Sequence, residues 1–456
     1  MHSVVDRWID EHKDDIVATV QKSVSFRSVG VDSDVTGAPF GIPCRDLLLH
    51  TLSLCGGFGF ETTNLDGYIG YADFGEGKET LGILSHLDIV PEGEGWQHDP
   101  FGGEIVDGQI VGRGTQDDKG PAMAAIYALA AVKQAGFDFR RKVRLIFGCD
   151  EERNMRCLKY YKEHAQMPDM AFSPDAKYPL VNSEKNIFHA RYTAAFSSAL
   201  RLQAGTVVNA VPGKAVATVA FSKETVLIAA AQCPSDSFSY NAETCEGGSR
   251  VTVTGRAAHA STPEAGKNAL QAMLLLLNKL PLEGEDKRLV AGLVQAFGMK
   301  YYGETVGLDI SDDSGRLTLN LGLMDWNEHG FSITLDIRAP ISASCDLLLS
   351  KLDAAFASFG AFRMSYTFSE GYYVPEDNEL VRTLLDVYAA RTGEHALPHR
   401  IGGGTYARHL KMAVAFGPER PNRENLVHMA NESLYIEDLI EDTKMYADAI
   451  IALATK

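Results

Sequence analysis

Short apolar runs alternate with longer amphipathic stretches over the first part of the chain. Residues 81–84 and 143–148 are largely apolar and have the length of buried strands. Apolar residues recur at helical spacing in three stretches: 4–25, 42–55 and about 121–134. Residues 104–111 predict a hairpin, because Asp107-Gly108 fits its two-residue turn. Strands that alternate with helices in this way predict an α/β domain.

The pattern changes after about residue 184. Short alternating strands are predicted at 189–196, 214–221, 250–255, 317–323 and 331–338, and longer helices at about 266–280 and 344–358. Patterns of the first kind return at 378–392, 411–416 and 436–453. We therefore expect one domain formed by residues 1–184 and 372–456. An inserted α+β domain of residues 185–371 interrupts it, with helices on one face of a smaller sheet.

Composition narrows the class of protein. The 456 residues are 45% hydrophobic and 23% charged, which is ordinary for a globular protein. The formal net charge of −17 argues against a nucleic-acid partner, because such proteins carry a basic face. No apolar stretch reaches the ~18 residues of a membrane span, and the N-terminus lacks a signal pattern. Seven scattered cysteines without a C-x-x-C pair favour a reduced, cytoplasmic protein.

Acidic and histidine side chains follow the predicted strands or lie in glycine-bounded loops. They are His86, Asp88, Asp117, Asp118, Glu151, Glu152, Asp175 and His428. Each alone has an ordinary explanation, such as a core histidine, or a helix N-cap for Asp118 before Lys119-Gly120-Pro121. Open α/β sheets, however, bind ligands beyond the carboxyl ends of their strands. Together these residues predict a site that activates a water molecule with metal.

The residue types favour two divalent metal ions. Zinc takes histidine nitrogen and carboxylate oxygen, and a carboxylate can bridge two ions ~3.5–4 Å apart. Asp117 is the candidate bridge. The motifs contain no cysteine, which disfavours a soft metal. We expect zinc first, with manganese or cobalt as alternatives that fit the same ligands.

Two acids are predicted to assist the metal site. Glu151, beside a candidate ligand, can take a proton from the attacking water and deliver it to a leaving amine. Asp88 lies two residues from His86 and can accept the second ring N–H of that histidine, which would fix its orientation.

The motifs along the chain resemble those of the M20 family of dinuclear metallopeptidases. Within that family the chain is most similar to the PepV-type dipeptidases and less so to the carnosinases. The motifs run in family order: S-H-L-D at 85–88, G-R-G-T-Q-D-D-K-G-P at 112–121, D-E-E at 150–152, S-P-D-A at 173–176, N-A-V-P-G at 209–213, A-A-H-A-S-T-P-E-A-G-K-N-A at 257–269, D-I-R at 336–338, G-G-G-T-Y-A-R at 402–408 and H-M-A-N-E at 428–432.

The resemblance implies a zinc-exopeptidase fold, with a mixed-sheet catalytic domain and the inserted domain as a lid. It also implies the ligands: one metal would bind His86, Asp117 and Asp175, and the other Asp117, Glu152 and His428. The Asp117–Asp118 peptide bond would be cis. Glu151 would be the general base and Asp88 the orienting acid.

The resemblance also implies substrate contacts from the lid. His259 would polarise the scissile carbonyl, and Arg338 would bind the C-terminal carboxylate of the substrate. Asn209 would also contact the substrate, as would a loop of the catalytic domain, Gly402, Gly403, Gly404 and Thr405. Two plainer interpretations remain open, namely Arg338 as a surface charge of the sheet and Asn209 as a turn residue. The loop is not a P-loop, because no Lys-Ser or Lys-Thr follows it.

We therefore expect a dipeptidase for substrates with a free N-terminus, in which a bridging metal-hydroxide attacks and Glu151 serves as base. In the PepV-type members that the chain resembles, an enlarged lid supplies the substrate contacts within one chain. With an insertion of residues 185–371, the resemblance therefore implies a monomeric active unit. The alternatives are a deacylase of N-acyl amino acids with the same apparatus, and a non-catalytic binding protein on this scaffold. The loop 93–96 receives no role. The pair Arg153 and Arg156 either tunes the preference for substrate charge or lies on the surface, and both interpretations stay open. His98, His189, His329, His399 and His409 are interpreted as structural or surface residues.

Overall fold

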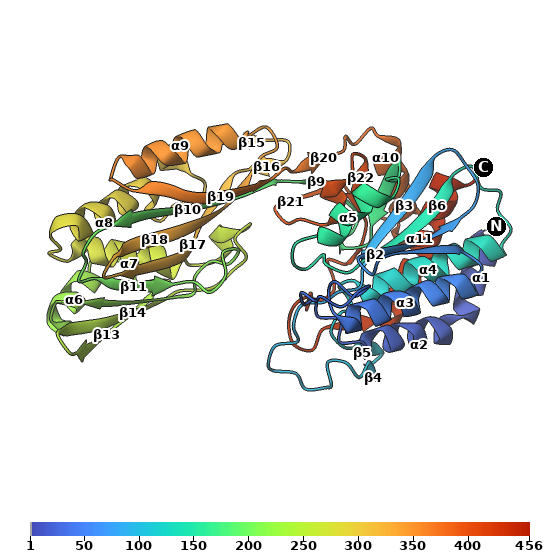
Figure 1. Ribbon diagram of the computed structural model, residues 1–456, viewed down its shortest axis with the longest axis horizontal. Helices are drawn as coiled ribbons and strands as arrows, with labels where there is room; N and C mark the ends of the chain where they lie inside the picture. Colours follow the sequence, from blue (N-terminus) through green and yellow to red (C-terminus); the bar gives the residue numbers. More distant parts are fainter. Residues whose placement is uncertain (1) are drawn as a thin grey trace. The chain divides into compact units, whose positions relative to one another are not determined.

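The computed structural model describes residues 2–456, which divide into two compact units (Figure 1). Unit 1 contains the described residues up to Ser183, Val374–His399 and Gly404–Lys456. Unit 2 contains Glu184–Tyr373 and Arg400–Gly403. The predicted glycine loop is thus divided, with Gly402 and Gly403 in unit 2 and the next two residues in unit 1.

Unit 1 is built on a mixed sheet. Its strands lie in the spatial order β1 (Glu61–Leu65), β2 (Ile69–Phe74), β6 (Lys142–Gly148), β3 (Thr80–His86), β7 (Met170–Ser173) and β22 (Ala413–Ala415). The central strand β3 is parallel to both β6 and β7, whereas β2 is antiparallel to β6. All but the first residue of β3 and of β6 are buried, as expected where helices cover both faces of a sheet.

Helices and small strands complete unit 1. The helices are α1 (His2–Glu11), α2 (Lys13–Val24), α3 (Ile42–Gly57), α4 (Lys119–Gln134), α5 (Arg156–His164), α10 (Glu379–Thr392) and α11 (Ile436–Ala454). A three-stranded sheet joins the hairpin β4 (Glu104–Val106) and β5 (Gln109–Val111) to β24 (Ser433–Tyr435). The strands β8 (Ala176–Lys177) and β23 (Pro418–Glu419) form a parallel pair. Short elements β9 (Val181–Glu184), β20 (Tyr372–Tyr373), β21 (His399–Ile401) and η3 (Tyr406–His409) lie near the points where the chain changes unit.

Unit 2 is an eight-stranded antiparallel sheet with four helices. The strand order is β13 (Ser239–Cys245), β14 (Gly248–Thr254), β12 (Lys214–Val219), β11 (Arg201–Ala204), β17 (Thr318–Asn327), β18 (Gly330–Ala339), β10 (Asn186–Ala195) and β19 (Phe362–Ser369). The helices are α6 (Lys223–Ala230), α7 (Ala269–Lys279), α8 (Gly284–Phe297) and α9 (Cys345–Ala357). Buried and more exposed residues alternate along β10 and β12, so one face of the sheet meets the core and the other does not.

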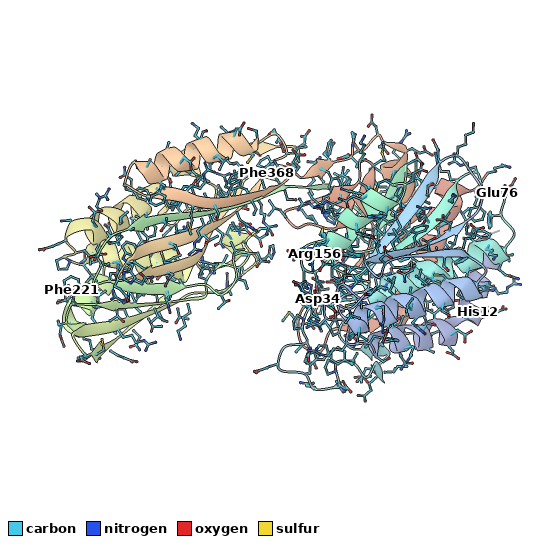
Figure 2. The ribbon with its side chains drawn as sticks, viewed as in Figure 1. His12, Asp34, Glu76, Arg156, Phe221 and Phe368 are labelled. Carbon is cyan, nitrogen blue, oxygen red and sulfur yellow. The ribbon has the colours of Figure 1, made fainter. Side chains whose placement is uncertain are left out.

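The predicted fold class is confirmed, and most elements lie within a few residues of their expected bounds. The helix expected at 4–25 is wrong as one piece. It breaks at His12, which is labelled in Figure 2. The His12 ring stacks on Trp8, and its Nδ1 lies 2.7 Å from the Trp8 carbonyl oxygen. The helices α6 and α8 and the strands β11, β13 and β19 were not predicted. No helix within residues 2–456 has the length and apolarity needed to cross a membrane.

Candidate metal centre

The predicted ligands of unit 1 lie at one edge of its sheet. His86 is the last residue of β3, and Glu152 follows β6. Asp175 follows β7, and Asp117 precedes α4. Because β3 runs parallel to both β6 and β7, the carboxyl ends of these three strands meet at the same edge. His428 comes from the loop that precedes β24.

Asp117 lies between the two histidines. Its Oδ1 is 2.8 Å from His86 Nε2, and its Oδ2 is 3.0 Å from His428 Nε2. His428 Nε2 is also 3.0 Å from Glu152 Oε1. One ligand atom each from His86, Asp117 and Glu152 lie within 4.8 Å of one another. The two oxygens of one carboxylate thus face two different imidazoles, which is the arrangement that a bridging ligand needs.

The remaining acids of the site share its electrostatic field. Burial raises the pKa of Asp175, and the nearby charges of Asp117 and Glu152 raise it further. Burial likewise raises the pKa of Glu151, helped by the charges of Asp175 and Glu152. Several carboxyl groups therefore lie close together where little water reaches them. All of them can be ionised at the same time only when cations nearby compensate their negative charge.

Contacts with the carboxylates favour a proton on each of the two histidines, which would balance part of this charge. Burial opposes a charge on His86, but its contacts with Asp117 and Asp88 raise its pKa well above the usual value. Burial also opposes a charge on half-exposed His428, whose pKa is raised by hydrogen bonds to Asp117 and Glu152. Divalent ions would take the place of these protons. Two imidazoles with several carboxylates form a donor set that fits zinc, manganese or cobalt.

Asp88 differs from its predicted contact. The Nδ1 atom of His86 lies 2.9 Å from the main-chain carbonyl oxygen of Asp88, and 3.7 Å from its carboxylate. The carboxylate instead accepts hydrogen bonds at 3.1 Å from the main-chain N–H groups of Glu151 and Glu152. Asp88 thus orients His86 through its backbone, while its side chain holds the turn that carries the candidate base.

Asp118 also differs from its predicted role. It occupies the N-cap position of α4, but its side chain forms no cap hydrogen bond. One of its oxygens accepts a hydrogen bond from the main-chain N–H of His86 at 3.1 Å. The cis peptide bond expected between Asp117 and Asp118 is present.

The basic pair after the turn of residues 150–152 is engaged within unit 1. Arg156 donates to buried Asp150 from Nε at 3.0 Å and to Asp32 from Nη2 at 2.6 Å. Arg153 forms a 3.2 Å ion pair with Asp32. These contacts favour a structural role for the pair over a role in choosing substrate charge.

The predicted lid residues lie in unit 2. Arg338 is only 4% exposed, so it is not a surface charge. Its Nε and Nη2 donate to Asp336 at 2.7 and 2.9 Å, and its Nη1 donates to the Gly402 carbonyl at 2.6 Å. His189 Nε2 lies 3.0 Å from Asp336 Oδ2, the oxygen that also accepts from Arg338 Nη2. The sequence had left His189 without a role and had not singled out Asp336, although Asp336 opens the D-I-R motif.

His259 and Asn209 are neighbours in unit 2. Residues Ala210 and His259 form an isolated antiparallel bridge, and the Asn209 carbonyl accepts a hydrogen bond from Ala260 N–H at 2.9 Å. Asn209 lies in a turn, as its plainer interpretation has it, and its side chain is exposed. His259 Nδ1 lies 2.7 Å from Ser261 Oγ, and Ser261 in turn contacts Gly402 closely enough that a Cβ there would meet it at 2.7 Å.

Comparison with known proteins adds an independent finding to this geometry. The model of peptidase family M20/M25/M40 matches residues 82–452, which include every metal ligand proposed from the sequence. The chain belongs to this family. The expected family and the expected hydrolase class are thereby confirmed.

Individual relatives match over nearly the whole chain. A putative dipeptidase, YtjP, of Bacillus subtilis is 36% identical, over 97% of this chain and 98% of its own. The Beta-Ala-Xaa dipeptidase of Lactobacillus delbrueckii subsp. lactis is 33% identical, over 97% of this chain and 96% of its own. The solved structure of the Saccharomyces cerevisiae di-peptidase Dug1p has a TM-score of 0.60 at 16% identity, covering 99% and 98% of the two chains. At that identity it supports the fold alone.

Proposed function

We propose that this family member is a metal-dependent dipeptidase that hydrolyses dipeptides with a free N-terminus. The observation that carries the proposal is the position of the Asp117 carboxylate, 2.8 Å from His86 and 3.0 Å from His428. The relatives described above, which span the full chain, are named as dipeptidases, and this supports the same substrate class here.

The residues of unit 1 would hold the metal ions and move the proton. One ion would bind His86, Asp117 and Asp175, and the other Asp117, Glu152 and His428. When bound, the pair supplies an acidified water and polarises the carbonyl oxygen. Glu151 takes a proton from the attacking water and delivers it to the leaving amine. The bonds from Asp88 to the N–H groups of Glu151 and Glu152 keep base and ligand in a fixed relation.

The residues of unit 2 would bind the substrate. The three bonds of Arg338 to Asp336 and Gly402 use three of the five N–H groups of its guanidinium. Two N–H groups are left to grip a carboxylate, which would select for a free C-terminus. His259 donates to the developing oxyanion, and its contact with Ser261 orients its ring. Asn209 and Gly403 of unit 2, with Gly404 and Thr405 of unit 1, complete the predicted contacts.

Replacement of Glu151 tests the chemistry. In Glu151→Gln we expect unchanged zinc binding and a loss in kcat of roughly 10²–10⁴-fold, because an acid–base group is removed. The exposed Glu163→Gln on α5 is the matched control and should keep full activity. Turnover of Glu151→Gln at the wild-type rate would remove this assignment.

A substrate comparison tests the activity itself. The wild-type enzyme, reconstituted with zinc, is offered a dipeptide library and the same dipeptides N-acetylated. We expect hydrolysis of the free dipeptides only. Preference for the acetylated set would instead establish a deacylase, and zinc binding without turnover of either set would indicate a binding protein.

Assembly and location are part of the same proposal. One chain carries both sets of residues, which supports a monomeric active unit, testable by sedimentation at the assay concentration. The seven cysteines are free thiols, which is consistent with the cytoplasmic location predicted from their spacing.

A further inference from the structure

Glu432 is a buried carboxylate that touches the loop of Asp117. It lies four residues after His428 and directly before β24, and its exposed fraction is 0%. The sequence showed it only as the last letter of H-M-A-N-E, and neither the metal ligands nor the proposed base includes it. A buried acid without a catalytic task needs another explanation for the desolvation that it costs.

The oxygens of Glu432 are occupied by the loop of residues 112–117. Its Oε1 accepts from the main-chain N–H groups of Gly114 at 3.1 Å, Gln116 at 2.9 Å and Asp117 at 3.3 Å. Its Oε2 accepts from Arg113 Nη1 at 2.6 Å. Its own carbonyl oxygen accepts from Gly112 N–H at 2.8 Å. One residue thus fixes the backbone of the loop up to and including the candidate bridging ligand.

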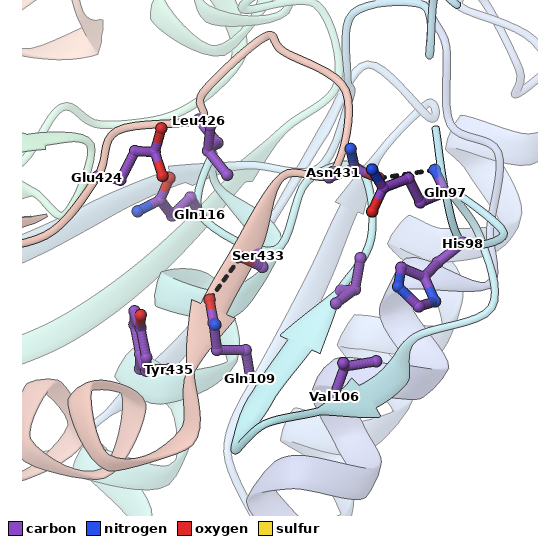
Figure 3. Close-up of a pocket in the computed structure, with 11 residues that line it drawn as sticks. Gln97, His98, Val106, Gln109, Gln116, Glu424, Leu426, Asn431, Ser433 and Tyr435 are labelled. Atoms are coloured by element: carbon purple, nitrogen blue, oxygen red, sulfur yellow. Dashed lines mark hydrogen bonds between the residues drawn. The ribbon is translucent and has the colours of Figure 1, made fainter. Parts of the chain in front are cut away.

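The backbone of Glu432 is itself held on both sides. Asn431 accepts a hydrogen bond from Gln97 N–H at 2.8 Å, and Ser433 Oγ donates to Gln109 Oε1 at 2.8 Å (Figure 3). Both bonds lie in the lining of a cavity of about 220 Å³. Ser433 also begins the strand that pairs with β5. Glu432 is therefore a fixed point against which the loop can be positioned.

Arg113 extends the same arrangement. Its guanidinium lies 5.4 Å from the centre of the Trp96 ring, and its Nη2 donates to the Glu92 carbonyl at 3.3 Å. A buried ion pair adds little net stability compared with apolar side chains of similar volume. A buried ion pair is better supported as a means of selecting one conformation among several. Here the pair of Arg113 and Glu432 would select the conformation of the 112–117 loop.

We propose that Glu432 is a positioning residue for the metal centre: it fixes the loop of residues 112–117 so that the Asp117 carboxylate faces His86 and His428 together. The inference rests on the proposed metal centre and adds a determinant of metal affinity to it. Partners that orient metal ligands typically change affinity by about 10- to 100-fold when they are replaced.

The test compares two buried acids of unit 1. Glu432→Gln keeps the size of the side chain but removes its charge and places an amide against Arg113 or the loop N–H groups. The matched control is Asp442→Asn, because Asp442 is 1% exposed and pairs with Arg420 at 2.7 Å and with the Tyr178 hydroxyl at 2.8 Å. Zinc affinity of each full-length chain is measured by competition with a chromophoric chelator, and folding by circular dichroism and thermal unfolding.

We expect both variants to unfold at lower temperature, but only Glu432→Gln to bind zinc about 10- to 100-fold more weakly than wild type. Equal zinc affinity in Glu432→Gln and Asp442→Asn would overturn the inference. If Glu432→Gln does not fold, Glu432→Asp takes its place, since it keeps the charge but falls one methylene short of the loop. Wild-type zinc affinity in that variant would equally overturn the inference. Failure of the wild-type chain to bind zinc, manganese or cobalt would instead refute the proposed function.

Discussion

The candidate residues of the two units differ in how their buried charge is balanced. In unit 1, Asp117, Glu152 and Asp175 gather beside two histidines, and burial raises the pKa of Glu152 and Asp175. In unit 2, the buried Arg338 is already paired with Asp336 through two bonds, and the pKa of Asp336 is lowered by His189 and Arg338 in spite of burial. The acids of unit 1 are therefore suited to bind external cations, whereas Arg338 and Asp336 of unit 2 balance each other within the protein.

This difference in charge balance fits different functions for the two units, metal binding in unit 1 and substrate binding in unit 2. A carboxylate group that needs cations is suited to hold metal, because binding relieves the repulsion among its members. A guanidinium held in place by an internal partner is suited to recognise a carboxylate, because little ordering is left to be done on binding. Replacement of a metal ligand in unit 1 should thus change metal binding, and replacement of Arg338 in unit 2 should change substrate affinity alone.

The largest expected effect comes from removal of the candidate bridge. Asp117→Ala should lower zinc binding and reduce kcat/KM by at least roughly 10³-fold, because bound metal supplies several kcal/mol of transition-state stabilisation. Zinc content by atomic absorption and dipeptide hydrolysis measure the two effects. A variant that kept two zinc ions per chain would contradict the bridging role and remove the contrast between the units.

Arg338→Lys tests the other side of the comparison. We expect KM for a dipeptide to rise roughly 10- to 100-fold, since a charged, two-pronged contact worth about 1.5–3 kcal/mol is lost. Zinc binding should stay unchanged. The corresponding dipeptide amide, which lacks the carboxylate, should be hydrolysed equally well by variant and wild type.

The control for Arg338→Lys is Arg363→Lys in the same sheet. Arg363 also binds an acid through two bonds, to Asp353 at 3.1 Å each, but belongs to no predicted site. Its replacement should leave KM unchanged for both substrates. An equal rise in KM for dipeptide and amide in Arg338→Lys would show that the arginine shapes unit 2 without recognising a carboxylate.

The sequence predicted the positions of the unit 1 residues better than their contacts. Apolar runs locate β3 and β6, and the residues at their ends follow directly, so His86 and Glu152 were placed at one sheet edge from pattern alone. Which atom of Asp88 meets His86 depends on the course of the backbone after the strand, which the pattern does not contain. The same holds for Glu432, whose partners lie more than 300 positions away along the chain.

Unit 2 shows the same limit on a larger scale. Apolar and polar residues largely alternate along strands β10, β17 and β18, and these strands were predicted. Helix α8 was not predicted, because its beginning contains the polar residues Glu285 to Arg288. The burial of Arg338 could not be predicted, because it involves a contact with the distant Gly402 that the local pattern does not contain. Local periodicity thus predicts helices and strands, whereas tertiary contacts determine which charged side chains become buried.

The smallest expected effect concerns His409, a histidine of unit 1 that lacks the carboxylate partners of His428. Burial lowers its pKa to about 4, helped by the charges of Lys162 and Arg408, and its Nε2 lies 2.9 Å from Met155 Sδ. A histidine whose folded pKa is depressed stabilises the fold fully above its unfolded value of ~6.5, and this contribution is lost as pH falls towards 4.

His409→Gln should therefore reduce the acid sensitivity of the fold. Between pH 7 and pH 4 we expect the wild-type chain to lose about 1–3 kcal/mol more stability than the variant, from the pKa shift of a partly buried group. Urea unfolding of both chains, freed of metal with chelator, measures this difference because the metal ligands are common to both. Since His409 faces no acid of the metal centre, zinc affinity at pH 7 should be the same in both chains. A His409→Gln variant that no longer bound zinc would show that His409 belongs to the metal centre of unit 1.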